Sequence, residues 1–353
     1  MPNAMFDTRT MMQALDLAPQ AETWLRDRYF SNVKTFDTAK LEIDVRKGKR
    51  RMAPFVHPKI GGKTVERQGY RVDTFEAPEV SPDMVTTADQ MLQRSIGENV
   101  YGATDPNTRA ARQLGEDLVE LDEIITRREE WMASQALFTG GIEVKGEGYD
   151  EVLSYWPTDP AERPYLELAA GDRWNEATGD PLLDLRTQAR TIRQGSGINP
   201  TEVILGTDAL EALLANENFA KQLDNRRIDL GHIDPQRLPN GVTYWGYHKG
   251  AAVDIYTYDE WYLDEETGEE TPMVPLKSAL LGSPNVRTTM AYGCVTLMRG
   301  SGDNAAPEFY EARRVPDSWT QRKNPAGRIV QIKSRPLPII HQIDGFFVMK
   351  VLA

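Results

Sequence analysis

A long helix is the clearest element that the pattern of hydrophobic and polar residues predicts. Asp105-Pro106 is a favourable helix start and Gly140-Gly141 a favourable end, so we expect a helix over 105–139, roughly 50 Å long at 1.5 Å per residue. Its single apolar stripe lacks a sustained heptad, which favours a helix lying on a sheet over a coiled coil. Steps of three, four or a multiple of these separate the stripe residues Leu114, Leu118, Leu121, Ile125, Met132 and Ala136.

Residues 36–80 have the pattern of a charged β-hairpin. Leu41, Ile43 and Val45 alternate with charged residues, the period of a half-buried strand. The second run, 51–68, contains Pro54, Pro58 and two adjacent glycines, and it indicates an edge strand or a projecting loop. The segment between the runs, 46–51, places five positive charges around one glycine. Because an isolated ribbon is marginal in water and this one has no evident apolar partners, we expect it to be stable only when laid on another surface.

The first 35 residues have the pattern of an arm. Short helices are predicted over 11–17 and 21–30, separated by Pro19, and the second holds an aromatic cluster with Trp24, Tyr29 and Phe30. Few apolar residues precede residue 20, too few to offset the entropy of ordering an arm alone. We therefore expect the arm to be ordered only in an assembly.

The remaining chain alternates between helix and strand signals. A helix is predicted over 182–193, and then a buried strand over 202–206 followed by a helix from Asp208 to about Asp224. From Gly241 the pattern changes to strands, ending with 346–352. The Pro- and Asp-rich stretch that holds Trp156 and Trp174 indicates mostly loop.

Composition narrows the function classes. The chain has 353 residues, which exceeds the usual size of one hydrophobic core, so we expect two or more lobes. Its net charge of −12 argues against a dedicated nucleic-acid binder. We interpret this negative charge mainly as a source of solubility. Cys294 is the single cysteine, so no intramolecular disulfide can form, and a reducing cytoplasm fits. Neither a secretory signal nor an apolar stretch long enough to span a bilayer is evident, so we expect a soluble subunit.

No constellation of residues indicates catalysis or metal binding. The four histidines are widely separated, Cys294 next to Val295 is more typical of a buried residue than of a nucleophile, and the acidic turn 264–270 lacks the ligand order of a calcium loop. Gly206 lies between a strand and a helix without a phosphate-binding motif. The basic run 46–51 could grip nucleic acid, but no aromatic platform is interleaved with it, which favours a protein-facing role.

A series of short motifs resembles one known family. They are Ala53-Pro54-Phe55-Val56-His57-Pro58, Gly61-Gly62, Arg67-Gln68-Gly69-Tyr70, Phe75-Glu76-Ala77-Pro78, Tyr292-Gly293-Cys294-Val295, Pro316-Asp317-Ser318-Trp319 and Ser334-Arg335-Pro336-Leu337-Pro338. In this order they resemble the major capsid proteins of lambda-like tailed phages, also called major head proteins or the capsid protein E family. Each motif alone is weak, but their order along the chain is fairly specific, with 142–190 matching least.

The resemblance implies an α+β fold, the major capsid fold of tailed phages and herpesviruses. It divides the chain into an N-terminal arm (1–35), an extended hairpin loop (36–80), a peripheral domain (81–190) with the spine helix 105–139, an axial domain (191–315) and C-terminal strands (316–353). The implied function is a structural one, without a cofactor. Copies would self-assemble into hexamers and pentamers and form an icosahedral head shell around packaged double-stranded DNA.

The implied partners are other copies of the chain, scaffold, portal and decoration proteins, and DNA contacted non-specifically, with no membrane. The shell would be assembled in the host bacterial cytoplasm and be part of the virion, and we favour decoration over a covalent crosslink. The alternative is an acidic α+β enzyme or ligand-binding protein with an inserted hairpin. The residues expected to contact neighbouring copies are Trp24, Tyr29, Phe30, Arg46, Lys47, Lys49, Arg50, Arg51, Phe55, Arg67 and Tyr70.

Overall fold

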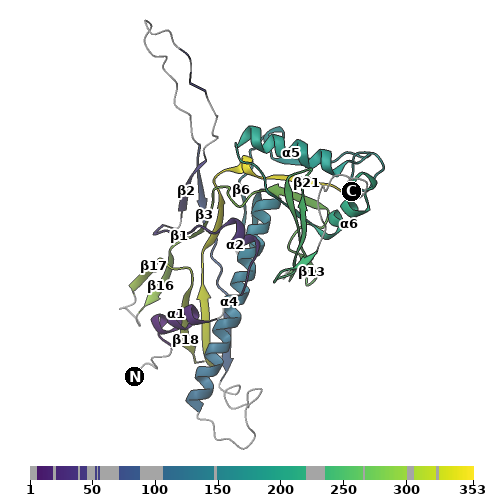
Figure 1. Cartoon of the computed structure of the whole chain (residues 1–353). Coiled ribbons are helices and arrows are strands. Elements are labelled where there is room, and N and C mark those ends of the chain that lie inside the picture. The colour runs from purple at the N-terminus through teal and green to yellow at the C-terminus, as the bar shows by residue number, and fades with distance from the viewer. Residues whose placement is uncertain are drawn as a thin grey trace, which may run out of the picture.

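The computed structural model describes residues 6–18, 21–38, 40–45, 52–53, 55, 71–87, 106–146, 149–219, 235–264, 267–299, 306–322 and 326–353. These residues form an elongated body along one long helix, a sheet domain beside one end of that helix, and a hairpin whose two strands lead away from the body (Figure 1). The helices are α1 (Thr8–Leu17), α2 (Leu25–Tyr29), α4 (Pro106–Phe138), α5 (Pro181–Gly195) and α6 (Thr207–Ala215), with the short 3-10 turns η2 (Pro160–Glu162) and η4 (Ile343–Gly345).

Helix α4 confirms the long helix predicted over 105–139. The side chains of Leu118, Leu121 and Ile125 are at most 3% exposed and pack with Val330 and Ile332 of strand β19 (Gly327–Lys333). The single apolar stripe therefore lies on a sheet of the same subunit, as its pattern predicts.

Helix α1 packs on its own subunit. Met11 is 1% and Leu15 is 6% exposed, and both belong to the apolar cluster formed by α4 and β19. Because α1 contacts both α4 and strand β18, these two side chains are enclosed from two sides. Full burial of each contributes about 1.5–3 kcal/mol. The expectation that the arm is ordered only in an assembly is therefore wrong for α1.

A seven-stranded mixed sheet forms the domain beside the upper end of α4 in Figure 1. Ile204 and Leu280 point into one apolar cluster, whereas Val203 and Leu281 point into another on the opposite face. Because both faces are covered, its central strands are continuous apolar runs. The strand order is β7 (Tyr165–Glu167), β21 (Phe347–Lys350), β14 (Ser278–Gly282), β8 (Glu202–Leu205), β11 (Val253–Tyr258), β10 (Val242–His248) and β9 (Gln236–Arg237).

Glycine at position 206 allows a close approach between α6 and the chain before β14. A Cβ atom there would lie 2.3 Å from the carbonyl oxygen of Leu276 and 2.4 Å from that of Pro275. This backbone contact explains the strand–glycine–helix pattern without a phosphate. Helix α6 ends at Ala215, since Asn216 is extended and its side-chain oxygen accepts from the backbone N–H of Asn218. Residues 217–219 are helical again, and 220–224, where the predicted helix would end, lie outside the described residues.

Two three-stranded sheets and four ribbons complete the described part of the chain. One sheet has the order β1 (Val33–Thr35), β15 (Thr288–Tyr292) and β20 (Pro336–Ile340), and the other β18 (Val315–Gln321), β19 (Gly327–Lys333) and β4 (Asp83–Thr87). The ribbons are β2 (Lys40–Val45) with β3 (Arg71–Glu76), β5 (Gly141–Gly146) with β6 (Tyr149–Ser154), β12 (Trp261–Leu263) with β13 (Glu270–Pro272), and β16 (Val295–Arg299) with β17 (Ala306–Tyr310).

Several sequence predictions find their elements here. Helix α5 confirms the helix predicted over 182–193, and the acidic turn 264–270 connects β12 to β13. The stretch around Trp156 and Trp174, predicted to be mostly loop, contains the three-residue strand β7. No helix among the described residues combines the length and the apolar character that crossing a membrane requires.

Candidate functional site: a buried ion cluster and the root of the hairpin

The hairpin predicted over 36–80 has its two strands at 40–45 and 71–76. Strands β2 and β3 pair antiparallel, with Leu41 opposite Phe75. The first strand is as predicted, and the second lies beyond the run 51–68. That run was expected to be an edge strand or a projecting loop, and most of it lies outside the described residues. The absence of a strong alternation of apolar residues in 71–76 hid the second strand from sequence reasoning.

The root of this hairpin is packed into the main core of its own subunit. Leu41 is 3% and Phe75 is 9% exposed, and the Phe75 ring lies 5.4 Å from that of Tyr155, the residue that follows β6. The Tyr155 hydroxyl donates a hydrogen bond to the carbonyl of Pro338 at 2.5 Å. The expectation that the ribbon has no apolar partners of its own is therefore wrong at its base, where the ribbon is fixed in direction.

Most of the predicted contact residues of the hairpin lie outside the described residues. Phe55 is described, and its side chain is fully exposed, 102% relative to a reference residue. An exposed phenylalanine is available to a neighbour. The predicted contact residues outside the described part are Arg46, Lys47, Lys49, Arg50, Arg51, Arg67 and Tyr70.

The aromatic cluster of the arm is buried inside the subunit instead. Tyr29 is 2% and Phe30 is 1% exposed, so the prediction that these two contact a neighbouring copy is wrong. Trp24 is half-buried, with its ring 5.4 Å from that of Tyr256, and its predicted contact stays a prediction. The aromatic spacing marked a docking helix correctly, but its partner is the same chain.

Helix α2 is held by one carboxylate of α4. Glu130 accepts hydrogen bonds from the backbone N–H groups of Trp24 at 3.1 Å, Leu25 at 2.8 Å and Arg26 at 2.9 Å. The hydroxyl of Tyr258 donates to it at 3.0 Å. Burial raises the pKa of Glu130, although these backbone and side-chain donors partly offset the effect. A carboxylate at the N-terminus of a five-residue helix satisfies donors that would otherwise be orphaned there.

The neighbouring carboxylate, Glu129, is the centre of an ion cluster. Its side chain is 0% exposed, and it accepts hydrogen bonds from Arg314 at 2.5 Å, Arg26 at 2.8 Å and Arg313 at 3.3 Å. Burial alone would raise the pKa of Glu129, but Arg314, Arg313 and Arg26 outweigh it and hold the pKa below its ordinary value. Three segments distant in sequence thus meet at one carboxylate.

Arg314 extends the cluster along α4. It donates to Asp122 at 2.6 Å, to the hydroxyl of Thr126 at 3.1 Å and to that of Ser334 at 3.2 Å. The guanidinium is therefore almost fully used, as a buried charge requires. The cluster joins the arm, the long helix and the chain before β18 and β20.

A second pair joins α2 to the seven-stranded sheet. Arg28 donates to Glu202 of β8 at 2.7 and 2.5 Å, and the Tyr29 hydroxyl donates to the same carboxylate at 3.0 Å. The Arg28 guanidinium also lies 5.0 Å from the ring centre of Tyr256. With Glu129 and Glu130, this pair makes α2 the joint between the sheet domain and the elongated body.

Sequence reasoning missed this joint, although one signal was available. Glu129 lies four residues after Ile125 and three before Met132, so it occupies the apolar stripe of α4. A charged residue on a buried stripe requires a buried partner. The adjacent pair Arg313-Arg314 supplies two such partners, but only the tertiary structure brings them there.

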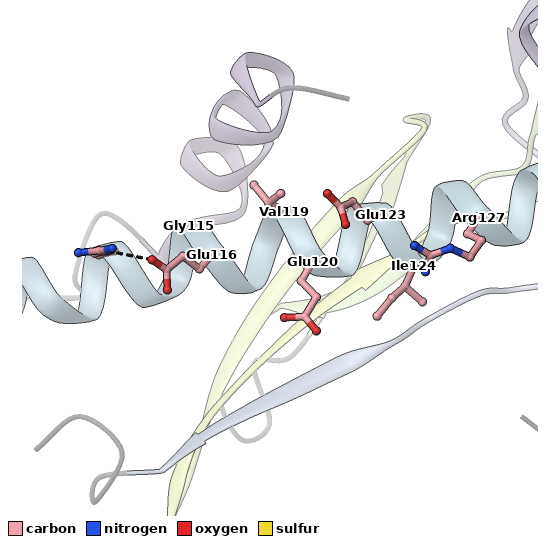
Figure 2. Close-up of a pocket in the computed structure, with 8 residues that line it drawn as sticks. Gly115, Glu116, Val119, Glu120, Glu123, Ile124 and Arg127 are labelled. Atoms are coloured by element: carbon pink, nitrogen blue, oxygen red, sulfur yellow. Dashed lines mark hydrogen bonds and ion pairs between the residues drawn. The ribbon is translucent and has the colours of Figure 1, made fainter. Parts of the chain in front are cut away.

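The exposed side of α4 forms an open hollow of about 680 Å³. In Figure 2, Val119 and Glu123 lie on one side of the helix, whereas Glu120 and Ile124 lie on the other. Arg112 and Glu116 form an ion pair at 2.9 Å across one helical turn. This lining is typical of a solvated helix face and does not indicate catalysis. Among the described residues, no three His, Cys, Asp or Glu side chains are grouped to hold a metal ion, and Cys294 is buried.

Comparison with known proteins gives concordant matches along the whole chain. The family model described as phage major capsid protein E matches residues 7–351. The major capsid protein of Escherichia phage lambda is 23% identical over 349 residues, covering 97% of this chain and 98% of the relative. The major capsid protein of Escherichia phage N15 is 23% identical over 327 residues, covering 92% of each.

Solved structures show the same fold. A prophage capsid protein from E. coli CFT073 aligns with a TM-score of 0.68 at 19% identity, covering 98% of this chain and 99% of the other. A phage-related protein from Bordetella bronchiseptica RB50 aligns with a TM-score of 0.54 at 12% identity, covering 97% and 96% of the two chains.

Proposed function

The chain belongs to the phage major capsid protein E family, and we propose that its copies form hexamers and pentamers that close an icosahedral head shell around packaged double-stranded DNA. The chain is a structural capsid protein with the α+β fold of tailed-phage capsid subunits. The family match over residues 7–351 is the observation that carries the proposal. The alternative of an acidic enzyme or ligand-binding protein has no support from the described residues or the relatives.

The arrangement of the subunit supports a division into an axial and a peripheral domain. We assign the seven-stranded sheet with α5 and α6 to the axial domain, and α4 with the two three-stranded sheets to the peripheral domain. The sheet crosses the boundaries expected from sequence, since β7 and β21 both join it. The joint at Glu129, Glu130 and Glu202 links the two domains through α2. A stiff link of this kind suits a subunit that must present the same contacts in every ring.

The hairpin is the proposed clamp on a neighbouring copy. Its root is fixed in the core through Leu41 and Phe75, and beyond the root Phe55 is fully exposed. The five positive charges within 46–51 suit an acidic partner, and the chain itself carries a net charge of −12. The proposed contact residues are Trp24, Arg46, Lys47, Lys49, Arg50, Arg51, Phe55, Arg67 and Tyr70.

Further partners follow from the same role. Scaffold, portal and decoration proteins are proposed partners, and packaged DNA is contacted non-specifically. Assembly takes place in the cytoplasm of the host bacterium, and the product is the virion shell. The net negative charge supports weak contact with DNA, because a surface rich in carboxylates repels phosphates.

Electron microscopy and sedimentation of the purified protein test the proposal. We expect closed shells, tubes or rings, whereas a compact monomer at every concentration would contradict a shell-forming role. Reversal of Arg50 and Arg51 to glutamate should impair assembly while the circular dichroism spectrum of the subunit stays unchanged. Arg9→Glu, an exposed reversal on α1, is the control and should assemble normally. Normal particles from the hairpin variant would remove the clamp but leave the capsid role intact.

A further inference from the structure

The β12–β13 ribbon exposes an apolar face on the axial domain. Trp261 is 42% and Leu263 is 64% exposed, and the pairing places Pro272 and Glu270 opposite them on the same face. An exposed tryptophan is typical of the energetic centre of a protein interface, and Leu263 adds apolar area beside it.

The opposite face of this ribbon is anchored to α4. Tyr262 alternates with Trp261 and Leu263, and its ring meets that of Trp131 edge-on at 6.4 Å. The indole N–H of Trp261 donates to Asp259 at 2.8 Å. The exposed indole therefore has its polar atom satisfied within the subunit and is held ready for an apolar contact.

The segment that forms this ribbon carries only negative charge. Residues 259–270 contain seven acidic residues and no basic residue. Glu269 and Glu270 are exposed, and Glu270 faces Leu263 across the ribbon. A partner for this surface must offer an apolar group flanked by cations.

Helix α5 offers such a surface on the same domain. Leu183 is 58% exposed, and Arg186, Arg190 and Arg193 follow it at steps of three or four, so the four side chains share one face. Asp184, the acidic residue of this helix, is turned inward and accepts a hydrogen bond from the indole N–H of Trp174 at 3.0 Å. Like charges at these steps disfavour an isolated helix, whereas an acidic partner would relieve the repulsion.

The two surfaces lie on opposite edges of the axial domain. Figure 1 shows α5 along one edge and β13 at the other, with the strands of the sheet between them. They are therefore placed to meet in a head-to-tail contact between two copies. Repetition of such a contact closes a ring when the rotation fits.

We propose that the Trp261–Leu263 face of the β12–β13 ribbon docks on the Leu183–Arg186–Arg190 face of α5 in the next copy around each ring. The proposal rests on the proposed function and names the contact that joins axial domains. Trp261 and Leu263 pack against Leu183, and the carboxylates of the ribbon, Glu269 and Glu270 among them, pair with the arginines. Such charge pairs give register and partner choice more than raw affinity.

A charge-swap experiment on the full chain tests this contact. Arg186→Glu with Arg190→Glu reverses α5, and Glu269→Arg with Glu270→Arg reverses the ribbon. Each reversal alone should reduce the yield of closed particles at least about tenfold, which corresponds to about 1.4 kcal/mol. The chain carrying all four substitutions should recover most of the yield. Arg9→Glu with Arg322→Glu changes the net charge as the α5 reversal does, and should assemble like the wild type.

Crosslinking provides a readout that does not depend on charge. Leu183→Cys and Leu263→Cys in one chain, treated with a short bismaleimide after assembly, should give a ladder of linked copies. Either cysteine alone should give at most a trace, since Cys294 is buried. Unfolding temperatures of all variants, measured before assembly, separate a lost contact from a lost fold.

Four outcomes would overturn the contact. If both reversed variants assemble with the wild-type yield, the contact is refuted and the capsid role stands. The same holds if the α5 reversal assembles with the wild-type yield but its shells bind double-stranded DNA more weakly. In the second case the arginines contact nucleic acid. The contact is also refuted if the fourfold variant folds but does not recover the yield, and crosslinking gives no ladder. Failure of the wild type itself to assemble would overturn the proposed function and this contact together.

Discussion

Replacement of Glu129 by glutamine removes the charge at the centre of the buried cluster with almost no change in shape. The two carboxylate oxygens of Glu129 accept from three guanidinium groups at 2.5, 2.8 and 3.3 Å. Glutamine offers one oxygen and turns an NH₂ group toward the arginines, which have no use for a donor. Arg26 and Arg314 are 7% and 8% exposed, so their charge stays buried.

The magnitude follows from this geometry. Removal of one partner from a buried ion cluster leaves an uncompensated charge and typically costs about 3–5 kcal/mol. The stability of a typical domain is about 5–15 kcal/mol, so the variant should lose a large part of it. Denaturant unfolding of the unassembled subunit measures the loss. Glu123→Gln, an exposed substitution on the same helix, is the control and should change stability by less than about 0.5 kcal/mol.

The pH dependence gives a second measurement. The arginines hold the pKa of Glu129 below its ordinary value of 4.5 against the opposing effect of burial. Its stabilising contribution is therefore present above pH 4.5 and is lost as the pH falls through the folded pKa. The stability difference between the wild type and Glu129→Gln should shrink below pH 4.5.

The adjacent residue should respond with the opposite sign. Burial raises the pKa of Glu130 above 4.5, so its protonation stabilises the folded state, and that contribution is lost as the pH rises through the folded pKa. The free energy of unfolding of the wild type minus that of Glu130→Gln should therefore increase as the pH falls toward 4.5. A Glu129→Gln variant within about 0.5 kcal/mol of the wild type, or the same slope for both variants, would refute the reasoning.

Three further substitutions test the packing. Leu121→Ala should cost about 2–5 kcal/mol in denaturant unfolding, because the side chain is 0% exposed, and a loss no larger than that of Val119→Ala would contradict its burial. Met11→Asp should release α1, so limited proteolysis should cut near residue 20 in the free subunit, and an unchanged digestion pattern would show that α1 is not held by this contact. Gly140→Ala should lower the unfolding temperature, because φ is +65° there and a Cβ would lie 2.0 Å from the Trp156 ring; the left-handed backbone alone costs about 1–2 kcal/mol, and wild-type stability would disprove the strain.

The local pattern of apolar residues was sufficient to predict elements that can be recognised without knowing which residues they pack against. The stripe Leu114 to Ala136 with its capping signals predicted α4 to within one residue at each end. The strand 202–205 and helix α5 were also found from local pattern, because burial on one side leaves a periodic apolar pattern and burial on both sides leaves a continuous apolar run. The family resemblance, carried by motifs in order, predicted the fold and the capsid role, and both are confirmed.

Partner identity was beyond local pattern. The aromatic residues Tyr29 and Phe30 signalled a docking surface, but their sequence is the same whether they dock on a neighbour or on their own subunit. Met11 and Leu15 were judged too few to hold an arm, because the enclosure that α4 and β18 provide is formed by residues more than 90 positions away. The second hairpin strand was missed because residues 71–76 do not alternate strongly between apolar and polar types. Its position depends on the pairing of Phe75 with Leu41, which is distant in sequence.

The sequence by itself determined helices α4 and α5, the strand 202–205, the fold family and the net charge of this protein. These properties depend on composition and on residues close together in the chain. Only the tertiary structure decided which charges are buried together, since Arg26, Glu129 and Arg314 share no local pattern and their energies depend on exclusion from water at one point. It also decided where the ribbon 261–272 and helix α5 lie, because each is placed by residues distant in sequence: Tyr262 packs against Trp131 of α4, and Leu182 and Leu185 of α5 pack on the seven-stranded sheet.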